Sequence, residues 1–148
     1  MATATMVDVS NILSPGMHAI VQRTVEKGQT GKDYGGGVMD DLLTTPAFVD
    51  LMIRAAIKAV DRHLPDGFVT VGRSMEFTHE SPTGTGMSVS ILATLTEIEG
   101  KLLIFDIIAS DELGAVGRGR HERVVVNRDD WTQKVQARLK PIQNIKIK

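Results

Sequence analysis

The chain has 148 residues and a formal net charge of −1, with charges of both signs mixed along its length. This length suits a single domain, and a hydrophobic fraction of 42% is ordinary for a globular protein. No acidic or basic block indicates a nucleic acid or a membrane surface as partner. The absence of cysteine excludes disulfides, thiolate metal sites and a cysteine nucleophile.

The ends of the chain carry no targeting signal that we recognise. Residues 1–6 lack the basic and long apolar regions of a signal peptide. No apolar run reaches the ~18 residues of a transmembrane helix. We therefore expect a cytoplasmic protein with a flexible N-terminal segment at 1–16, one domain at 17–140 and a flexible tail at 141–148.

The first predicted element is a strand over 18–25, where apolar and polar residues alternate in part. A glycine-rich loop at 28–37 follows. Its spacing fits neither phosphate-binding fingerprint, so a connector or lid and a direct phosphate contact both stay open. The sequence Thr-Thr-Pro at 44–46 is typical of a helix start, because Thr caps free amides and Pro fits the first turn. The predicted helix runs to about Leu64 and ends before Pro65.

This predicted helix is apolar around most of its circumference. One face has apolar residues at three- and four-residue spacing, and three more widen it: Phe48, Leu51, Met52, Ala55, Ala56 and Ala59, then Ile53, Ile57 and Val60. The polar residues are confined to a strip, so the helix is expected to be mostly buried.

Beyond the helix the hydrophobic period changes to two. We predict strands at 68–78, 87–96, 102–109 and 115–127, with a hairpin turn at Glu99-Gly100, and a terminal helix at 128–139. These strands are predicted to form an antiparallel four-strand meander. The strand at 102–109 is apolar on both faces and is expected to be central. One helix covers only part of such a sheet, which favours a homodimer or higher homo-oligomer.

Three segments carry a resemblance to a known family: Leu43–Met52, Val71–His79 with the following turn, and Gly117–Val124. Their order and spacing resemble the fluoroacetyl-CoA thioesterase branch of the hotdog-fold acyl-CoA thioesterase superfamily. The resemblance implies an α+β hotdog fold, with a five-stranded antiparallel sheet wrapped around a long central helix. It also implies an acyl-CoA ligand and no cofactor other than the coenzyme A of the substrate.

The resemblance assigns candidate site residues. In that family a Thr at the helix start, a Glu two turns later and a His after the second strand surround the thioester. The matched positions are Thr45, Ile53 and His79, and Gly72 matches a glycine near the thioester carbonyl. The carboxylate is therefore missing, and an isoleucine can neither attack a thioester nor activate water.

Each candidate also has a purely structural interpretation. Thr45 either only caps the helix or also contacts the substrate. His79 either activates water or is a surface histidine. Asp50 lies three residues before Ile53, about 60° around the helix. It either replaces the missing carboxylate or pairs with Arg54 four residues later. A carboxylate of Glu76, of Glu80 or of a partner subunit also stays open as the replacement.

The last predicted strand carries three arginines. Arg118 and Arg120 share one face of this strand, and Arg123 lies on the other. The resembled family has a His-Glu-Arg at the positions of residues 121–123, which implies that Arg123 helps to hold the site or binds the substrate, and guanidinium groups bind the phosphates of coenzyme A well. The alternative is a solvated strand with cross-strand ion pairs. His121 and Glu122 point to opposite faces and do not make a metal site.

Two functions stay open at this point. The first is a thioesterase for a small or medium acyl-CoA, in which Thr45 orients the carbonyl and His79 activates water or stabilises the developing charge. The second is a non-catalytic hotdog module that binds an acyl group and has lost hydrolysis together with the carboxylate. Ile53 favours the second function, whereas Thr45 and His79 favour the first. Fluoroacetyl specificity does not follow from the sequence.

Overall fold

The structure is a computed structural model, and it describes residues 7–26 and 41–143. The glycine-rich loop predicted at 28–37 lies outside these described residues. Within them, no helix is both long enough and apolar enough to cross a membrane.

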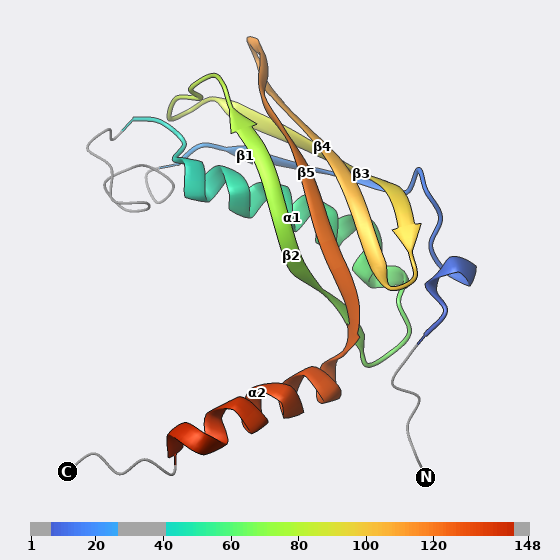
Figure 1. The fold of residues 1–148 in the computed structure, drawn as a ribbon. Coiled ribbons are helices and arrows are strands. Elements are labelled where there is room, and N and C mark those ends of the chain that lie inside the picture. The colour runs from blue at the N-terminus through green and yellow to red at the C-terminus, as the bar shows by residue number, and fades with distance from the viewer. Residues whose placement is uncertain (1–6, 27–40, 144–148) are drawn as a thin grey trace, which may run out of the picture.

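Five strands form one antiparallel sheet (Figure 1). They are β1 (His18–Thr24), β2 (Phe68–His79), β3 (Ser88–Glu99), β4 (Leu102–Asp111) and β5 (Gly114–Asn127), in the spatial order β1-β3-β4-β5-β2. The strand predicted to be central, β4, is the middle strand. A turn follows β3, and Gly100 has a φ of 63° there, so the predicted hairpin is confirmed.

The predicted four-strand meander is wrong for β2. This strand pairs with β5 and lies at the far edge of the sheet, so only β3, β4 and β5 form the meander. The turn-rich residues 80–87 are a crossover between the two sides of the sheet instead of a hairpin. The N–H of Glu80 donates to the carbonyl of Val116 (2.7 Å), which fixes the start of this crossover to β5.

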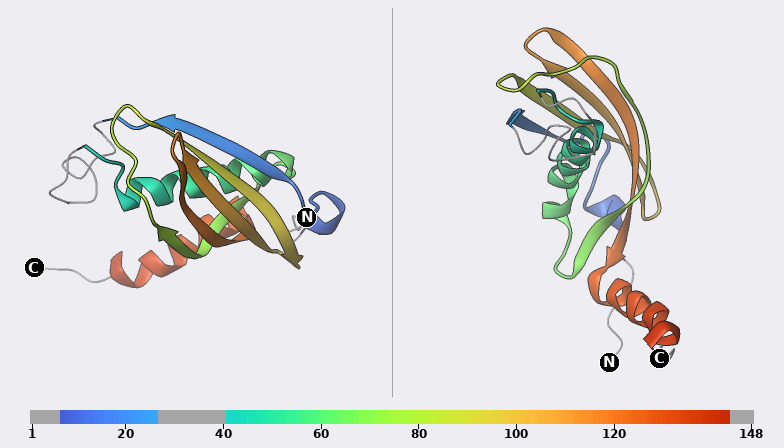
Figure 2. Two further views of the ribbon diagram at one scale, coloured as in Figure 1. Left: turned by 90° about the horizontal axis from the view of Figure 1, so that it is seen from above. Right: turned by 90° about the vertical axis from the view of Figure 1, so that its left-hand side faces the viewer.

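The central helix α1 (Thr45–Val60) lies on the concave side of the sheet, which curves around it (Figure 2). A short 3-10 turn, Asp61–His63, follows, and the helical segment stops at Leu64 as predicted. Gly117 and Gly119 of β5 let α1 approach closely. A Cβ at Gly117 would clash with the carbonyl of Thr78 on β2 and lie 3.3 Å from the Phe48 ring, and a Cβ at Gly119 would lie 3.4 Å from the Met52 sulfur. The N-terminal half of α1 is thereby held close to β5.

The helix lies mainly against β1 and β3. The ammonium group of Lys58 donates to the carbonyl of Ile20 on β1 (2.9 Å), so a positive charge lies at one point of that strand. At the opposite edge, the outer side of β2 pairs with no described strand. The two edges of the sheet therefore differ in protection.

Two described segments near the ends of the chain, residues 7–16 and 140–143, differ from the prediction. Val9 and Leu13 are buried in the core, because these apolar side chains anchor a segment that was expected to be loosely held. At the other end, α2 (Arg128–Gln143) continues beyond the predicted end at residue 139 and includes Pro141. This helix extends away from the body of the molecule (Figure 1) and has no buried residue.

Candidate functional site

Two consecutive threonines at the start of α1 have different tasks. Thr44 is the N-cap: its backbone is extended, and its hydroxyl accepts a hydrogen bond from the N–H of Ala47 (3.4 Å). The cap expected at Thr45 is therefore one residue earlier. Thr45 is the first residue of the helix, and its hydroxyl is free to bond elsewhere.

The Thr45 hydroxyl lies 2.9 Å from Nδ1 of His79, the last residue of β2. These two side chains are 34 residues apart in sequence, and the resemblance predicted both as site residues. The pairing of β2 with β5 and the close approach of α1 to β5 bring them together. The structure thus places the predicted Thr and His at the positive end of the helix dipole.

The ring of His79 is packed against its neighbours, but not all of its hydrogen-bonding capacity is used. It stacks on Phe48, with 4.5 Å between ring centroids, and its Nε2 is buried without a hydrogen-bond partner among the described residues. Desolvation by burial lowers the pKa of His79, so the imidazole is neutral at pH 7. A neutral ring with a free Nε2 can accept a proton from water or donate one to an oxygen, depending on the tautomer.

A hollow of about 240 Å³ opens beside this pair, and we call it the His79 hollow. Its lining consists of Leu42, Leu43, Thr45, His79, Glu80, Ser81 and Pro82. Of these, Glu80 is the one carboxylate within the described residues that lines the hollow. Its carboxylate accepts a hydrogen bond from the hydroxyl of Thr78 (3.1 Å). Both a carboxylate and the imidazole of His79 therefore line the His79 hollow, although position 53 carries no carboxylate.

The other candidate carboxylate, Asp50, lies elsewhere. Its Oδ2 is 2.8 Å from Nε of Arg54, so the predicted pairing along the helix is confirmed. Asp50 lines a separate hollow with Gln22 and Arg23 of β1, on the side of α1 away from β2. The structure does not bring Asp50 to the His79 hollow. Ile53 is half-buried on α1.

The predicted substrate-binding pair, Gly72 and Arg123, lies opposite each other on β2 and β5. A Cβ on Gly72 would be 3.5 Å from Nη1 of Arg123, at the point where the register of the two strands shifts. Seven residue steps along β2 lead from Gly72 to His79, which is roughly 23 Å along a strand. Within one chain, this pair is therefore distant from the His79 hollow.

Arg123 belongs to a buried polar network. It is 4% exposed, and its guanidinium donates to the hydroxyl of Thr70 (2.7 Å), to the carbonyl of Thr70 (2.8 Å) and to Nε2 of His121 (3.2 Å). The Nδ1–H of His121 donates to the carbonyl of Ser74 (2.7 Å), and the Thr70 hydroxyl donates to Asp61 (2.6 Å). Burial lowers the pKa of both Arg123 and His121. We call these five residues the Arg123 network.

The arginines on the opposite face are exposed, but the ion pair found there lies within β5 and does not cross to another strand, although the structural interpretation predicted cross-strand ion pairs. Arg120 pairs with Glu122 (3.1 Å), and the hydroxyl of Ser74 on the neighbouring strand donates to the same carboxylate (2.8 Å). His18 and His63 are exposed. Within residues 7–26 and 41–143, no group of three or more His, Asp or Glu side chains could hold a metal ion.

Sequence reasoning missed the roles of Phe48 and His121, and it left Glu80 as one of several carboxylates that could enter the site. The signal for His121 was available: it is two residues from Arg123 on one strand, and such residues share a face. The role of Glu80 had no such signal, because it depends on the path of the crossover after β2. Phe48 was assigned to the apolar face of α1, and only the pairing of β2 with β5 brings His79 onto its ring.

Comparisons with known proteins agree on one family. A family described as fluoroacetyl-CoA-specific thioesterase, FlK, matches residues 25–129. A fluoroacetyl-CoA thioesterase of Streptantibioticus cattleyicolor is 30% identical over 96 residues, which are 65% of this chain and 69% of that protein.

Solved structures show the same fold. A hot-dog-like protein from Thermanaerovibrio acidaminovorans superposes with a TM-score of 0.81 at 28% identity, covering 89% of this chain and 97% of that one. A variant of FlK in complex with fluoroacetate and CoA has a TM-score of 0.75 at 25% identity, covering 80% of this chain and 99% of that one. The hotdog fold expected from the resemblance is confirmed.

Proposed function

Because this chain belongs to the family of fluoroacetyl-CoA-specific thioesterases, we propose that it hydrolyses a small or medium acyl-CoA thioester at the His79 hollow. The observation that carries this proposal is the buried, unpartnered Nε2 of His79 beside the N-terminus of α1. A nitrogen left without a partner in a packed environment is costly unless a ligand or water completes it.

The mechanism follows from one tautomer of His79. Its Nδ1–H donates to the Thr45 hydroxyl, which in turn donates its own proton to the thioester carbonyl. Nε2 then takes a proton from a water whose oxygen attacks the carbonyl carbon. When the tetrahedral intermediate collapses, the carbon–sulfur bond breaks and the CoA sulfur receives the proton from Nε2. The amides of the first turn of α1 stabilise the negative charge on the oxygen.

The missing carboxylate at Ile53 gives Glu80 a role in this proposal. Glu80 lines the His79 hollow, whereas Asp50 is bound to Arg54 in another hollow. A carboxylate near the attacking water orients it and stabilises the imidazolium that forms. We therefore assign this role to Glu80 in preference to the Asp50 predicted from the sequence.

We further propose that the chain acts as a homodimer that pairs along β2. The outer edge of this 12-residue strand is open, whereas Lys58 places a positive charge at one point of β1. On β2, Phe77 is a large apolar side chain that is 38% exposed. A long open edge next to an exposed apolar side chain is a ready site for a second copy.

A second candidate function is a binding module without hydrolysis. The observation that favours it is Ile53, at the position where the family has its carboxylate. Such a module would keep the His79 hollow as an acyl site. It differs from the thioesterase in one measurable property, turnover.

The experiment is a panel of acyl-CoAs from acetyl to palmitoyl, assayed by release of free thiol. Wild type is compared with His79→Ala and Glu80→Gln, and Asp50→Asn is the matched control for loss of a carboxylate. We expect turnover that is lost in His79→Ala, reduced in Glu80→Gln and retained in Asp50→Asn. A folded protein that binds acyl-CoA but shows no turnover with any member of the panel would leave only the binding module.

A further inference from the structure

The imidazole of His79 lies against the ring of Phe48, and this contact restricts the plane of the imidazole. The ring centroids are 4.5 Å apart and the two planes are 30° from parallel, which is the geometry of an offset stack. Phe48 is fully buried, and it does not line the His79 hollow. The phenyl ring therefore supports the imidazole from the protein side and leaves the hollow to a ligand.

The first turn of α1 supplies both contacts of the imidazole. Thr45 and Phe48 are three residues apart, so their side chains lie on the same face of the helix. The N–H of Phe48 donates to the carbonyl of Thr44 (2.9 Å), which holds the Phe48 backbone within this turn. The hydroxyl that bonds to His79 and the ring that stacks on it thus belong to one rigid element.

The two contacts limit different rotations of the His79 side chain. The outer torsion of a histidine is broad and roughly two-fold, so an unsupported ring samples many planes and two flipped orientations. Stacking on Phe48 restricts the plane, but a flipped ring would stack equally well. The contact between Nδ1 and the Thr45 hydroxyl distinguishes the two orientations, because the flipped ring presents a carbon to that hydroxyl. Only the two contacts together give Nε2 a single position.

Gly117 of β5 admits the phenyl ring beside the imidazole. It pairs with His79 in the register of β2 and β5, and a Cβ at this position would lie 3.3 Å from the Phe48 ring and would clash with the carbonyl of Thr78. The backbone after His79 is fixed separately, because the next two N–H groups of the chain both donate to the carbonyl of Val116 (2.7 and 3.1 Å). A change at Phe48 should therefore alter the orientation of the imidazole more than the path of the backbone.

We propose that Phe48 is a positioning residue for thioester hydrolysis: its ring holds the imidazole of His79 in the plane in which Nδ1 meets Thr45 and Nε2 is left for the attacking water. This inference rests on the proposed function, because it assigns a role within that reaction. Phe48 touches neither the thioester nor the water, and it acts through His79. Glu80 is the other titratable group that lines the His79 hollow, and its backbone is held by β5.

The first experiment observes the His79 ring without substrate. Long-range ¹H–¹⁵N correlations of protein labelled at histidine report the tautomer and the pKa of each of the four imidazoles, and His79→Gln identifies the signals of His79. In the wild type we expect one tautomer, with the proton on Nδ1. Phe48→Leu removes the ring face, so His79 should give averaged tautomer signals and a pKa closer to 6.5, because its ring is less buried. Signals of His79 that equal those of the wild type overturn the proposal.

Phe105→Leu is the matched control for this variant. Phe105 is also fully buried, and its ring centroid lies 6.4 Å from that of His121. The substitution removes the same group from a comparable environment, so it should leave the signals of His79 unchanged. A similar change of His79 in both variants would mean that loosening of the core orients the ring, which contradicts a specific role of Phe48. If Phe48→Leu does not fold, Phe48→Met makes the same test, since its flexible side chain fills irregular space more readily.

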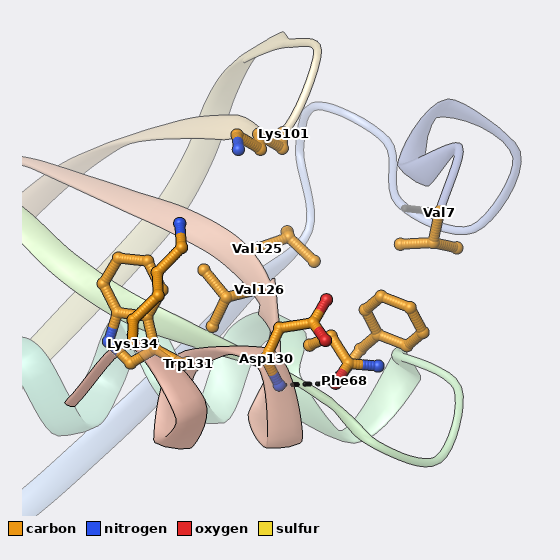
Figure 3. Close-up of a pocket in the computed structure, with 9 residues that line it drawn as sticks. Val7, Phe68, Lys101, Val125, Val126, Asp130, Trp131 and Lys134 are labelled. Atoms are coloured by element: carbon orange, nitrogen blue, oxygen red, sulfur yellow. Dashed lines mark hydrogen bonds between the residues drawn. The ribbon is translucent and has the colours of Figure 1, made fainter. Parts of the chain in front are cut away.

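Trp131 shows whether each variant is folded in a distant part of the molecule. It is the single tryptophan of the chain, and it lies with Phe68, Val126 and Lys134 in a pocket where β5 passes into α2 (Figure 3). Phe68 begins β2 and His79 ends it, and 11 residue steps of a strand span about 36 Å. A variant with the tryptophan emission of the wild type therefore retains the far end of the sheet, and its histidine signals can be compared directly.

The second experiment measures the reaction, with the acyl-CoA that the wild type hydrolyses fastest. Phe48→Leu should lower kcat about tenfold with KM unchanged, because Phe48 orients the base and does not line the hollow. The acid limb of kcat/KM should move to higher pH together with the pKa of His79, whereas Phe105→Leu should keep the wild-type profile. A kcat and an acid limb equal to those of the wild type would overturn the positioning role. Should no acyl-CoA be hydrolysed at all, the proposed function fails, and the histidine signals still decide whether Phe48 orients the ring.

Discussion

Two regions of the concave face each contain a histidine packed against the fold, buried at His121 and half-buried at His79, and they differ in how fully that histidine is bonded. At the start of α1, His79 bonds to Thr45 through Nδ1, and its Nε2 has no partner among the described residues. At the other end, His121 bonds to Ser74 through Nδ1 and to Arg123 through Nε2. Burial lowers the pKa of both rings.

This difference separates a reactive group from a structural one. In the Arg123 network every ring nitrogen of the histidine is used inside the protein, so its contribution is to folding. At His79 one nitrogen is left for something that the protein does not supply. The same residue type, on the same face of one sheet, therefore has opposite expected effects when it is removed.

The largest expected effects come from replacing each of the two histidines with alanine, one at a time. His79→Ala should lower kcat/KM by about 10²- to 10⁴-fold, since it removes the proposed base, and should leave the free energy of unfolding nearly unchanged. His121→Ala should lower the free energy of unfolding by about 2 kcal/mol, because a buried guanidinium loses its acceptor. Kinetics and urea unfolding of both variants check this. Equal effects of the two variants on either measurement would abolish the distinction.

Arg123→Met tests whether the network is structural or binds substrate, as the sequence predicts. We expect the free energy of unfolding to fall by about 3 kcal/mol, because the groups of Thr70 and His121 are left buried without their donor. Arg120→Met, on the exposed face, should change it by less than about 0.5 kcal/mol. If instead stability is unchanged and KM for acyl-CoA rises, Arg123 contacts the substrate.

The neighbouring threonines of α1 allow a finer test. Thr45→Val should lower kcat about tenfold. The variant loses the hydrogen bond that the Thr45 hydroxyl donates to the thioester carbonyl oxygen, on which negative charge develops during the reaction. Thr44→Val should lower the free energy of unfolding by about 1 kcal/mol through loss of the N-cap, with kcat retained. A loss of kcat in Thr44→Val and not in Thr45→Val would mean that the wrong hydroxyl has been assigned.

The smallest effect concerns pH. Because the folded pKa of His79 lies below its ordinary value of 6.5, kcat/KM should be constant above pH 6.5 and fall only below it, as the imidazole is protonated. His121 also has a lowered folded pKa, so the unfolded chain binds more protons just below pH 6.5. Its contribution to stability is thus complete above pH 6.5 and decreases as the pH falls through the folded pKa. Unfolding of the wild type and His121→Gln across this range checks the second part.

The elements of this fold are predictable from sequence because each has a local signal. The Thr-Thr-Pro start of α1, the Gly100 turn and the period-two strands are such signals, and the observed bounds differ from the predicted ones by only a few residues. The partner of β2 is not predictable in this way. The residues after it contain Pro and Gly and resemble a tight turn, yet the pairing depends on which edge of the sheet remains open.

The candidate site shows the same division. Thr45 and His79 could be named from the resemblance, but their contact depends on glycines of β5 that admit α1 closely. Glu80 could not be chosen over Asp50, since only the three-dimensional path of the crossover decides which carboxylate lines the hollow. Burial of Arg123 was likewise invisible, because a strand pattern gives the face of a residue and not its partners.

The cation that Lys58 places on the carbonyl of Ile20 has a consequence for behaviour at high concentration. A sheet with two open edges can add copies on both sides and grow into a fibre. Here one edge carries a positive charge, and in the proposed dimer the other edge is used once in a symmetric pair, so that growth would stop at two copies. Lys58→Met removes this charge, and we expect the variant to be less soluble at high concentration while its fold is unchanged.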